Sequence, residues 1–224
     1  MRILIFDSGP LINLTMNGLL YLLEDLRKKF DGKFIITSQV KFETIDKPAG
    51  IHRFELGALK IKRLLDLGVI ELPSSLGISD DAISLKTSGL MEIANKSLQL
   101  NGNWINIVSP AEISCLALST ILNEKNIETM IAIDERTTRT LCENPESLEN
   151  LMENKLHQNL DKSNKDLEVF HNFKFIRSSE IVYVAYKKGL LRLEGKKALE
   201  AALYATKFKG SSISFEEIDE LKKL

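Results

Sequence analysis

The sequence predicts an α/β fold with a mostly parallel central sheet. Short apolar runs, typical of buried strands, alternate along the chain with longer segments whose apolar residues recur at helical spacing. This alternation is typical of folds in which helices cover a sheet. With 224 residues, 44% of them hydrophobic, the chain is long enough to bury the core of one domain.

Strands are expected where the apolar runs are short and continuous. The four clearest runs are Ile3–Phe6, Phe34–Thr37, Met130–Ile133 and Phe173–Ile176. Two weaker runs are Val69–Leu72 and Ile105–Val108. Such runs favour strands that are buried on both faces of the sheet.

Helices are expected between these strands. A helical period is clear in Leu11–Phe30, Phe54–Leu67, Pro110–Asn123, Arg136–Glu143, Glu180–Lys188 and Lys196–Phe208. In the closing segment Ser214–Leu224, Ser214 and Glu217 have the spacing of a capping box, which opens a helix.

Two stretches interrupt the alternation, and we expect them to be insertions, at 74–103 and 145–168, in a single domain of residues 1–224. Ser74–Asn103 is polar and turn-rich at first, then helix-like from Leu90 to Leu100. Pro145–Glu168 is rich in Asn, Glu and Lys, with acids in excess. This composition predicts an exposed helical insertion or a mobile loop.

The composition points to a soluble, cytoplasmic protein with no membrane contact. No apolar run is long enough to span a membrane, and the first residues lack the features of a signal peptide. Cys115 and Cys142 have no closely spaced partner for a zinc site or a redox pair, so a reducing compartment is expected.

Positive charge is concentrated in two segments although the net charge is only −1. Ten Lys/Arg against four Asp/Glu lie from Leu26 to Arg63, and nine against three lie from Lys174 to Gly210. Local positive charge is what a nucleic-acid backbone requires. Solvated helix faces account equally well for any single lysine.

Two of the predicted strands run directly into a carboxylate, Asp7 after the first and Asp134 after Met130–Ile133. Ligands bind at the carboxyl ends of the strands in an open parallel sheet, so we expect these acids to converge. Converging carboxylates repel and are neutralised by protons or by a hard cation such as Mg²⁺. The pairing therefore points to metal-assisted phosphodiester chemistry.

Two further acids lie near predicted helix starts. Glu43 ends the run T-S-Q-V-K-F-E, about one helical turn past Ser38. Glu112 lies in S-P-A-E-I-S-C-L-A-L, in the first turn of a helix. With Asp7 and Asp134, they form an ordered series of four acids on the alternating chain.

In these motifs the chain resembles the PIN-domain nucleases, including the toxin ribonucleases of that superfamily. I-F-D-S-G-P-L-I-N-L looks like the family's opening strand, acid and helix, and Val-x-x-Glu ends at Glu43. The helix-opening Glu112 and the strand-then-acid step at Asp134 follow in the family's order. R-S-S-E-I-V-Y-V-A-Y-K-K-G-L-L is similar to its last strand and helix.

The resemblance implies a three-layer PIN-like fold and an endoribonuclease that depends on Mg²⁺ or Mn²⁺. Such an enzyme hydrolyses RNA phosphodiester bonds with a metal-activated water. By this resemblance Asp7, Glu112 and Asp134 ligate the metal, and Glu43 holds a second ion or orients the attacking water. It leaves open a homodimer and an antitoxin-like protein inhibitor, neither of which the sequence shows.

Other residues are candidates for supporting roles. Ser8 and either Ser178 or Ser179 are expected to add hydroxyls at the rim of the site, and Asn13 to steady Asp7 from the following helix. Two more candidates lie just after Asp134. Glu135 is able to replace or back up Asp134, and Arg139 either pairs with a nearby acid or touches phosphate.

Each of the four acids also has a purely structural explanation. Asp7 and Asp134 suit a helix N-cap, and Glu43 suits an exposed helix face. Ser109, Pro110 and Glu112 have the pattern of a capping box with proline at the first helical position. A cap and a ligand role can coexist.

Competing functions are separated by the residues that follow Asp7. A haloacid-dehalogenase phosphatase needs a second Asp two residues later, where Gly9 stands. The chain has neither the glycine-rich turn of a dinucleotide enzyme nor a P-loop. The remaining alternative is a catalytically inactive PIN-like protein that binds RNA or acts as a scaffold.

Overall fold

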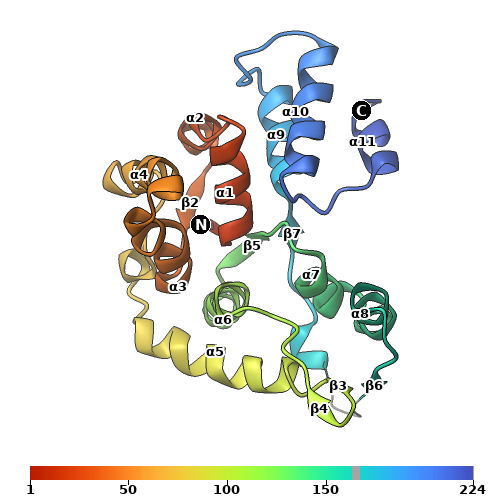
Figure 1. Cartoon of the computed structure of the whole chain (residues 1–224). Coiled ribbons are helices and arrows are strands. Elements are labelled where there is room, and N and C mark those ends of the chain that lie inside the picture. Colours follow the sequence, from red (N-terminus) through yellow and green to blue (C-terminus); the bar gives the residue numbers. More distant parts are fainter. Residues whose placement is uncertain (163–166, 224) are drawn as a thin grey trace.

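A four-stranded parallel sheet lies at the centre of the computed structural model, which describes residues 1–162 and 167–223 (Figure 1). Its strand order is β2-β1-β5-β7. These strands are β1 (Arg2–Phe6), β2 (Gly32–Ile35), β5 (Glu128–Ala132) and β7 (Phe175–Ile176). The predicted α/β class and the central parallel sheet are confirmed.

The central pair of the sheet has the most regular register. β1 pairs with β5 along its full length, from Arg2 opposite Glu128 to Phe6 opposite Ala132. Ile3, Ile5 and Phe6 of β1 are almost completely buried. Burial of both faces explains why the strands read as continuous apolar runs in the sequence.

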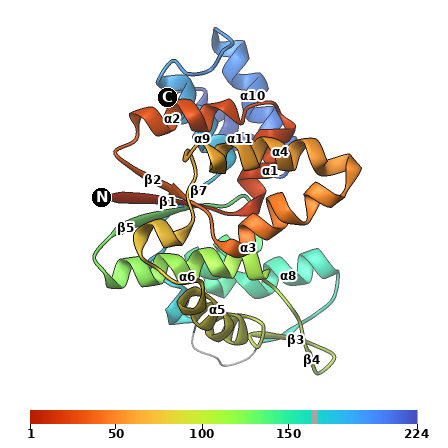
Figure 2. The same cartoon turned by 90° about the vertical axis from the view of Figure 1, so that its left-hand side faces the viewer.

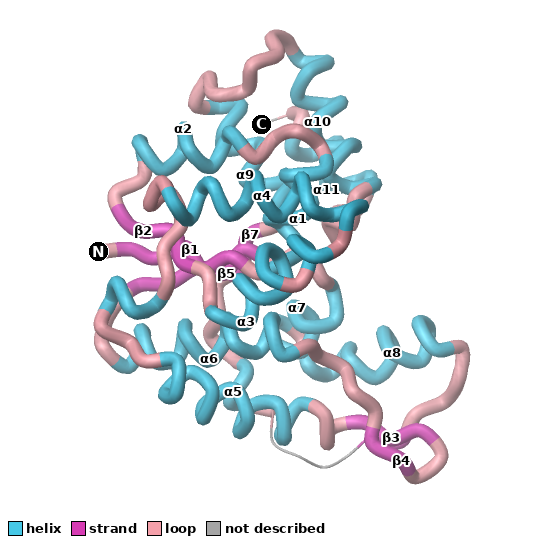
Figure 3. Tube along the Cα trace, turned by 60° about the vertical axis from the view of Figure 1, so that its left-hand side comes forward, coloured by secondary structure: helices cyan, strands magenta, loops and turns pink. Residues whose placement is uncertain are grey.

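Helices cover both faces of this sheet (Figure 2; Figure 3). On one side lie α1 (Ser8–Met16), α2 (Tyr21–Lys29), α4 (His52–Asp66), α9 (Ser178–Lys187) and α10 (Lys196–Phe208). On the other lie α5 (Asp80–Ala94), α6 (Pro110–Glu124) and α8 (Leu148–Leu156). The remaining helices are α3 (Ser38–Lys41), α7 (Arg136–Glu143) and α11 (Phe215–Leu221). Short helical turns are η1 (Phe42–Asp46), η2 (Pro48–Gly50), η3 (Pro73–Leu76), η4 (Pro145–Ser147) and η5 (Glu168–Phe170).

One large apolar core joins the sheet to its helices. It includes the buried faces of α1, α2 and α6, and its largest fully buried side chains include Phe6, Phe34 and Phe170. A second, small apolar cluster lies under the last two helices and consists of Leu199, Leu203, Ile213 and Ile218. None of the helices in the described ranges is both long enough and apolar enough to span a membrane.

The helix expected over Leu11–Phe30 is wrong as one continuous element, because the chain forms α1 and α2 with a break between them. Asn17 ends α1, and Gly18 takes a left-handed conformation with φ of 68°. Glycine adopts this conformation without the steric penalty that a side chain brings. Apolar residues keep their helical spacing through the break, so this spacing does not reveal the turn.

The two weaker strand predictions are largely wrong. Val69–Leu72 contributes only an isolated parallel bridge between Ile35 and Glu71. Ile105–Val108 forms no strand, and the nearby β4 (Asn103–Trp104) precedes it. The amide of Ile107 donates instead to the Asn95 side chain at 2.9 Å, so a loop contact replaces the sheet ladder.

The helix expected from Leu90 to Leu100 is confirmed only for residues 90–94, and its predicted start and end are wrong. The helix there is α5, and it begins ten residues earlier because Ser79 caps it by accepting from the Ala82 amide at 3.3 Å. Asn95 ends α5, and Leu98–Leu100 forms the strand β3.

Both insertions meet in a small antiparallel sheet, β4-β3-β6, which stands away from the central sheet (Figure 3). Its third strand, β6 (Asp161–Lys162), belongs to the second insertion. α8 confirms the helical part predicted for that insertion, whereas residues 163–166 of it lie outside the described residues. No local pattern in the sequence predicts this pairing, because β3 and β6 are far apart along the chain.

Two glycine substitutions test this backbone analysis in opposite directions. Gly18→Ala should lower the free energy of unfolding by about 1 kcal/mol, because alanine is strained at positive φ. Gly89→Ala should raise it by about 0.5–1 kcal/mol, because Gly89 lies in the exposed interior of α5 with open space around it. Urea unfolding of both variants measures the difference, and equal effects of the same sign would contradict the assigned conformations.

Candidate functional site

The candidate site lies at the carboxyl ends of β1 and β5, where the strand order changes direction. The chain passes from β1 outward to β2, then returns to place β5 and β7 on the other side of β1. Such a switch point is where open α/β sheets bind ligands. Asp7 follows β1 and Asp134 follows β5, and their side chains flank Gly9 at the start of α1.

Asp7 is a buried carboxylate with one oxygen unused. It caps α1, and its Oδ2 accepts from the amide of Gly9 at 3.2 Å. Its Oδ1 is buried and has no hydrogen-bond partner within the described part of the chain. Burial, followed by the charge of Glu112, raises the pKa of Asp7 to about 7.

Glu112 is held at the start of α6 by a complete capping box. Its Oε2 accepts from the Ser109 amide at 3.1 Å, while the Glu112 amide donates to the Ser109 hydroxyl. The same carboxylate oxygen accepts from Thr138 Oγ1 at 2.5 Å, across from α7. Burial raises the pKa of Glu112, and these hydrogen bonds offset part of that rise. The predicted cap is confirmed, and it leaves the carboxylate facing Asp7.

Glu43 reaches the site from an irregular helix. Thr37 caps α3 by accepting from the Val40 amide, and the helix then widens into the π-helical turn η1. Such turns are rare and frequently occur at functional sites. The half-buried Glu43 carboxylate accepts from Ser8 Oγ at 2.9 Å, which ties it to the start of α1.

These three carboxylates, Asp7, Glu43 and Glu112, form an acidic cluster around one buried thiol. Cys115 lies on the inner face of α6. Its pKa is raised by burial and then by the negative charges of all three acids. The charges of Glu112 and Glu43 also raise the pKa of Asp7. The structure therefore brings together three acids that are far apart in the sequence.

Asp134 borders this cluster and is bound by the opposite helix. Its Oδ1 accepts from the Ser178 amide at 2.8 Å, and its Oδ2 accepts from Asn13 Nδ2 at 3.1 Å. Burial raises the pKa of Asp134, and the hydrogen bond from the Ser178 amide offsets part of this rise. The prediction that Asn13 steadies Asp7 is wrong, because Asn13 holds Asp134 and the Thr206 carbonyl instead.

Glu135, and not Asp134, is the N-cap of α7. The explanation of Asp134 as a simple helix cap is therefore wrong. Glu135 Oε2 accepts from the Thr138 amide at 2.9 Å, and its Oε1 accepts from Thr137 Oγ1 at 2.8 Å. Lys155 lies 3.4 Å from the same Oε1. Glu135 is thus occupied as a cap beside the acidic cluster.

The remaining predicted residues are placed as follows. The Ser8 hydroxyl donates a hydrogen bond to the Glu43 carboxylate. Ser178 and Ser179 are fully buried, so the prediction that one of these two adds a hydroxyl at the rim is wrong. Ser179 Oγ lies 3.1 Å from Ser211 Oγ. Arg139 pairs with Glu143 at 3.0 Å, which confirms the acid-pairing alternative.

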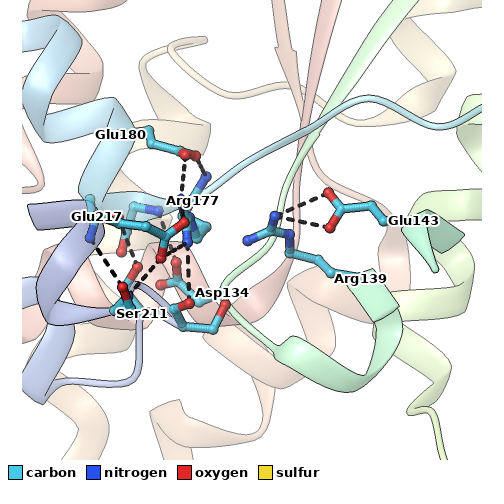
Figure 4. A network of polar contacts seen from close by, with 11 residues as sticks. Asp134, Arg139, Glu143, Arg177, Glu180, Ser211 and Glu217 are labelled. Carbon is cyan, nitrogen blue, oxygen red and sulfur yellow. Dashed lines mark hydrogen bonds and ion pairs between the residues drawn. The ribbon is translucent and has the colours of Figure 1, made fainter. Parts of the chain in front are cut away.

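A buried arginine beside Asp134 was not anticipated. Arg177, at the junction of β7 and α9, pairs with Glu180 at 2.7 Å and with Glu217 at 2.8 Å (Figure 4). It therefore links α9 to α11. The run R-S-S-E carries a local signal, because the Glu180 carboxylate also accepts from the Arg177 amide in a capping box. No local pattern in the sequence points to the second partner, Glu217, because it lies forty residues after Arg177.

The donor chemistry of the acidic cluster fits a hard divalent cation. All the side-chain atoms of the cluster that could bind a cation are carboxylate oxygens. Oδ1 of Asp7 has free lone pairs, because no hydrogen-bond donor in the described residues contacts it. However, no group of three or more His, Cys, Asp or Glu side chains is arranged to hold a metal ion in residues 1–162 and 167–223. Glu112 and Asp134 are instead held by the hydrogen-bond donors described above.

Comparison of the chain with protein-family models, curated proteins and solved structures gave no match. The functional argument therefore rests on the geometry of this site and on the sequence motifs that lead into it.

Asp7→Asn is expected to stabilise the protein above neutral pH. The pKa of Asp7 is 3.8 in an ordinary environment and about 7 in the fold, so between these values the folded state binds the extra proton. The contribution of Asp7 to the unfolding free energy therefore falls as pH rises from about 4 to about 7. Asparagine removes this penalty, with a gain of up to about 4 kcal/mol.

Urea unfolding of wild type and variant across this pH range measures the effect. The gain should be complete above about pH 8 and absent below about pH 4. A gain that does not change with pH would show that Asp7 is ionised in the fold throughout the range.

Proposed function

We propose that the protein is a metal-dependent endoribonuclease with a PIN-like fold. The single observation that carries the proposal is the acidic cluster at the switch point, together with the adjacent Asp134. Four carboxylates reach this edge of the sheet from separate elements, and the pKa of Asp7 is raised to about 7 by burial and by Glu112. Folds rarely concentrate perturbed acids without a functional reason.

Asp7, Glu112 and Asp134 would hold the cation. Asp7 contributes a buried, unpartnered oxygen, and the other two contribute carboxylates whose orientation is fixed by Ser109 and Ser178. An ionised carboxylate has several lone-pair sites, so these hydrogen bonds leave acceptor capacity. When bound, Mg²⁺ or Mn²⁺ would supply an activated water near neutral pH and stabilise the charge of the leaving oxygen.

Glu43 is suited to hold a second ion or to orient the attacking water. It is half-buried, unlike Asp7, and its second oxygen lies 3.5 Å from Gln39 Nε2. The bond from Ser8 fixes the other oxygen. A half-buried carboxylate with restricted rotation can accept a proton from a water at a defined position.

Exposed aromatic rings in the segment that contains Glu43 support a single-stranded RNA substrate. Phe42, next to Glu43, and Phe54, at the start of α4, are each 49% exposed. The guanidinium of Arg53 lies 5.4 Å from the Phe54 ring centroid. Exposed aromatics combined with cations are what single-stranded nucleic acids require, because bases stack on rings while phosphates meet positive charge. The basic segment Leu26–Arg63 contains these residues.

Cleavage of a single-stranded RNA in Mg²⁺ or Mn²⁺ tests the proposal. Wild type should cleave, and Asp7→Asn should reduce the rate by at least about a hundredfold, because it removes a charged ligand at the centre of the cluster. Asp31→Asn is the matched control, since Asp31 is exposed at the amino end of β2. Equal rates for wild type and Asp7→Asn would refute the role of Asp7.

Glu112→Gln separates the ligand role of Glu112 from its role as a cap. Glutamine also completes a capping box, so the thermal midpoint should stay within a few degrees of the wild-type value. Cleavage should nevertheless fall strongly, because the amide brings no charge to the cation. A variant that folds normally and cleaves at the wild-type rate would show that Glu112 is purely structural.

The catalytically inactive RNA-binding or scaffold protein is the alternative function. The lack of a preformed metal-holding group in the described residues favours it. Thermal unfolding in millimolar Mn²⁺ distinguishes the two, because an ion that binds only the folded state raises its stability. A rise that is lost in Asp7→Asn supports the nuclease, whereas no rise in wild type supports the inactive alternative.

A further inference from the structure

A second polar pocket lies close to Asp134, whose carbonyl accepts from the amide of the lining residue Ser212. It is a cavity of about 540 Å³. Its walls are α7, Arg177 at the start of α9, the loop of residues 211–214 and the first turns of α11. The sequence analysis did not anticipate this pocket, because its walls come from separate parts of the chain.

The lining of this pocket is cationic. Arg136, Arg139, Arg177 and Lys207 face two carboxylates, Glu143 and Glu217. Arg136 is exposed in the first turn of α7 and forms no ion pair with any residue that the structure describes. An excess of positive charge in a chain of net charge −1 indicates an anionic ligand.

Several hydrogen-bond donors here are left without partners. Nε of Arg177, Nε of Arg139 and Oγ of Ser212 are buried and have no acceptor among the described residues. The Arg177 side chain is only 8% exposed, so this is a buried charged group with spare donor capacity. Figure 4 shows Arg177 among Glu180, Glu217 and Asp134, with Arg139 and its partner Glu143 to one side of this group. Unsatisfied buried donors are costly and indicate a missing acceptor.

The pocket is physically joined to the candidate active site. The amide of Ser212 donates to the Asp134 carbonyl at 3.2 Å. The Asp134 carboxylate is bound by the Ser178 amide, one residue after Arg177. Asp134 therefore lies next to both regions: its side chain and that of Asp7 flank Gly9, and its carbonyl is bonded to the pocket residue Ser212.

We propose that this pocket binds a phosphate group of the RNA strand next to the phosphate that is cleaved. The inference rests on the proposed function and adds where the substrate backbone is held. Guanidinium groups and serine hydroxyls are the donors that most often contact nucleic-acid phosphates. With the acidic cluster and the cationic pocket both next to Asp134, the protein would hold the strand at two neighbouring phosphates.

The existing ion pairs are compatible with such a ligand. Arg139 and Glu143 form an i,i+4 pair in which the two side chains are 19% and 45% exposed. Only Nη2 of Arg139 contacts Glu143, so the pair leaves Nε of Arg139 for a phosphate. Arg177 keeps its ion pairs with Glu180 and Glu217 and offers the unused Nε.

Binding of a short fluorescent single-stranded RNA, measured by anisotropy in EDTA, tests the pocket without cleavage. The test variant is Arg136→Gln with Arg139→Gln, which leaves the structural Arg177 in place. The control is Lys125→Gln with Lys174→Gln at the amino edge of the sheet. It too removes one exposed unpaired cation and one cation paired to an exposed glutamate, Glu128. Circular dichroism establishes that each variant is folded.

The test variant should bind RNA about tenfold more weakly than the control, with a salt dependence that is shallower by about one unit of log K per log salt. Inorganic phosphate should shift the NMR amide signals of Ser211 and Ser212 in wild type and not in the test variant. Wild-type affinity and salt dependence in the test variant, or no RNA binding by wild type, would overturn the proposal.

The two proposals fail separately. Weakened RNA binding in the test variant with no cleavage by wild type in Mn²⁺ would leave the phosphate pocket standing and refute the nuclease. Cleavage by wild type with unchanged RNA binding in the test variant would refute the pocket alone.

Discussion

The fold holds like charges together at the edge of its sheet, and the rest of the site depends on this constraint. Asp7 is fixed by the end of β1 and by its cap on α1, while Glu112 is fixed by its capping box on α6. Neither side chain can turn to solvent without giving up these bonds. Burial then penalises both charged forms and raises the pKa of each, and the negative charge of Glu112 raises the pKa of Asp7 further. A proton on Asp7, or a cation beside it, relieves this repulsion.

The scaffold around the acids divides them into two groups with different surroundings. The acidic cluster has few donors near Asp7, whereas Asp134 receives bonds from the Ser178 amide and from Asn13. Ser178 lies at the start of α9, where helix amides favour negative charge. Asp134 is therefore the acid best supplied with internal donors, and Asp7 is the one that most requires an external partner.

The sequence predicted the central sheet well because its signals are local. β1 and β5 are continuous apolar runs that end at an acid, and α7 and α10 have the predicted bounds. The break at Gly18 also has a local signal, the turn dipeptide Asn17-Gly18, although the apolar period runs through it. The pairing of β3 with β6 could not be predicted in the same way, because it is a contact between distant segments. The same distinction applies to the site. The capping box of Glu112 is local, whereas its bond to Thr138 and the contact of Asn13 with Asp134 arise only when helices pack.

The most direct measurement of the central claim is a ¹³C NMR titration of the Asp7 side-chain carboxyl, with and without Mg²⁺. The account predicts an apparent pKa near 7 without the cation, because the carboxylate is buried beside Glu112, and a clear fall when Mg²⁺ is added, because a bound cation favours the charged form. A carboxyl that titrates near its ordinary value of 3.8 under both conditions would contradict it.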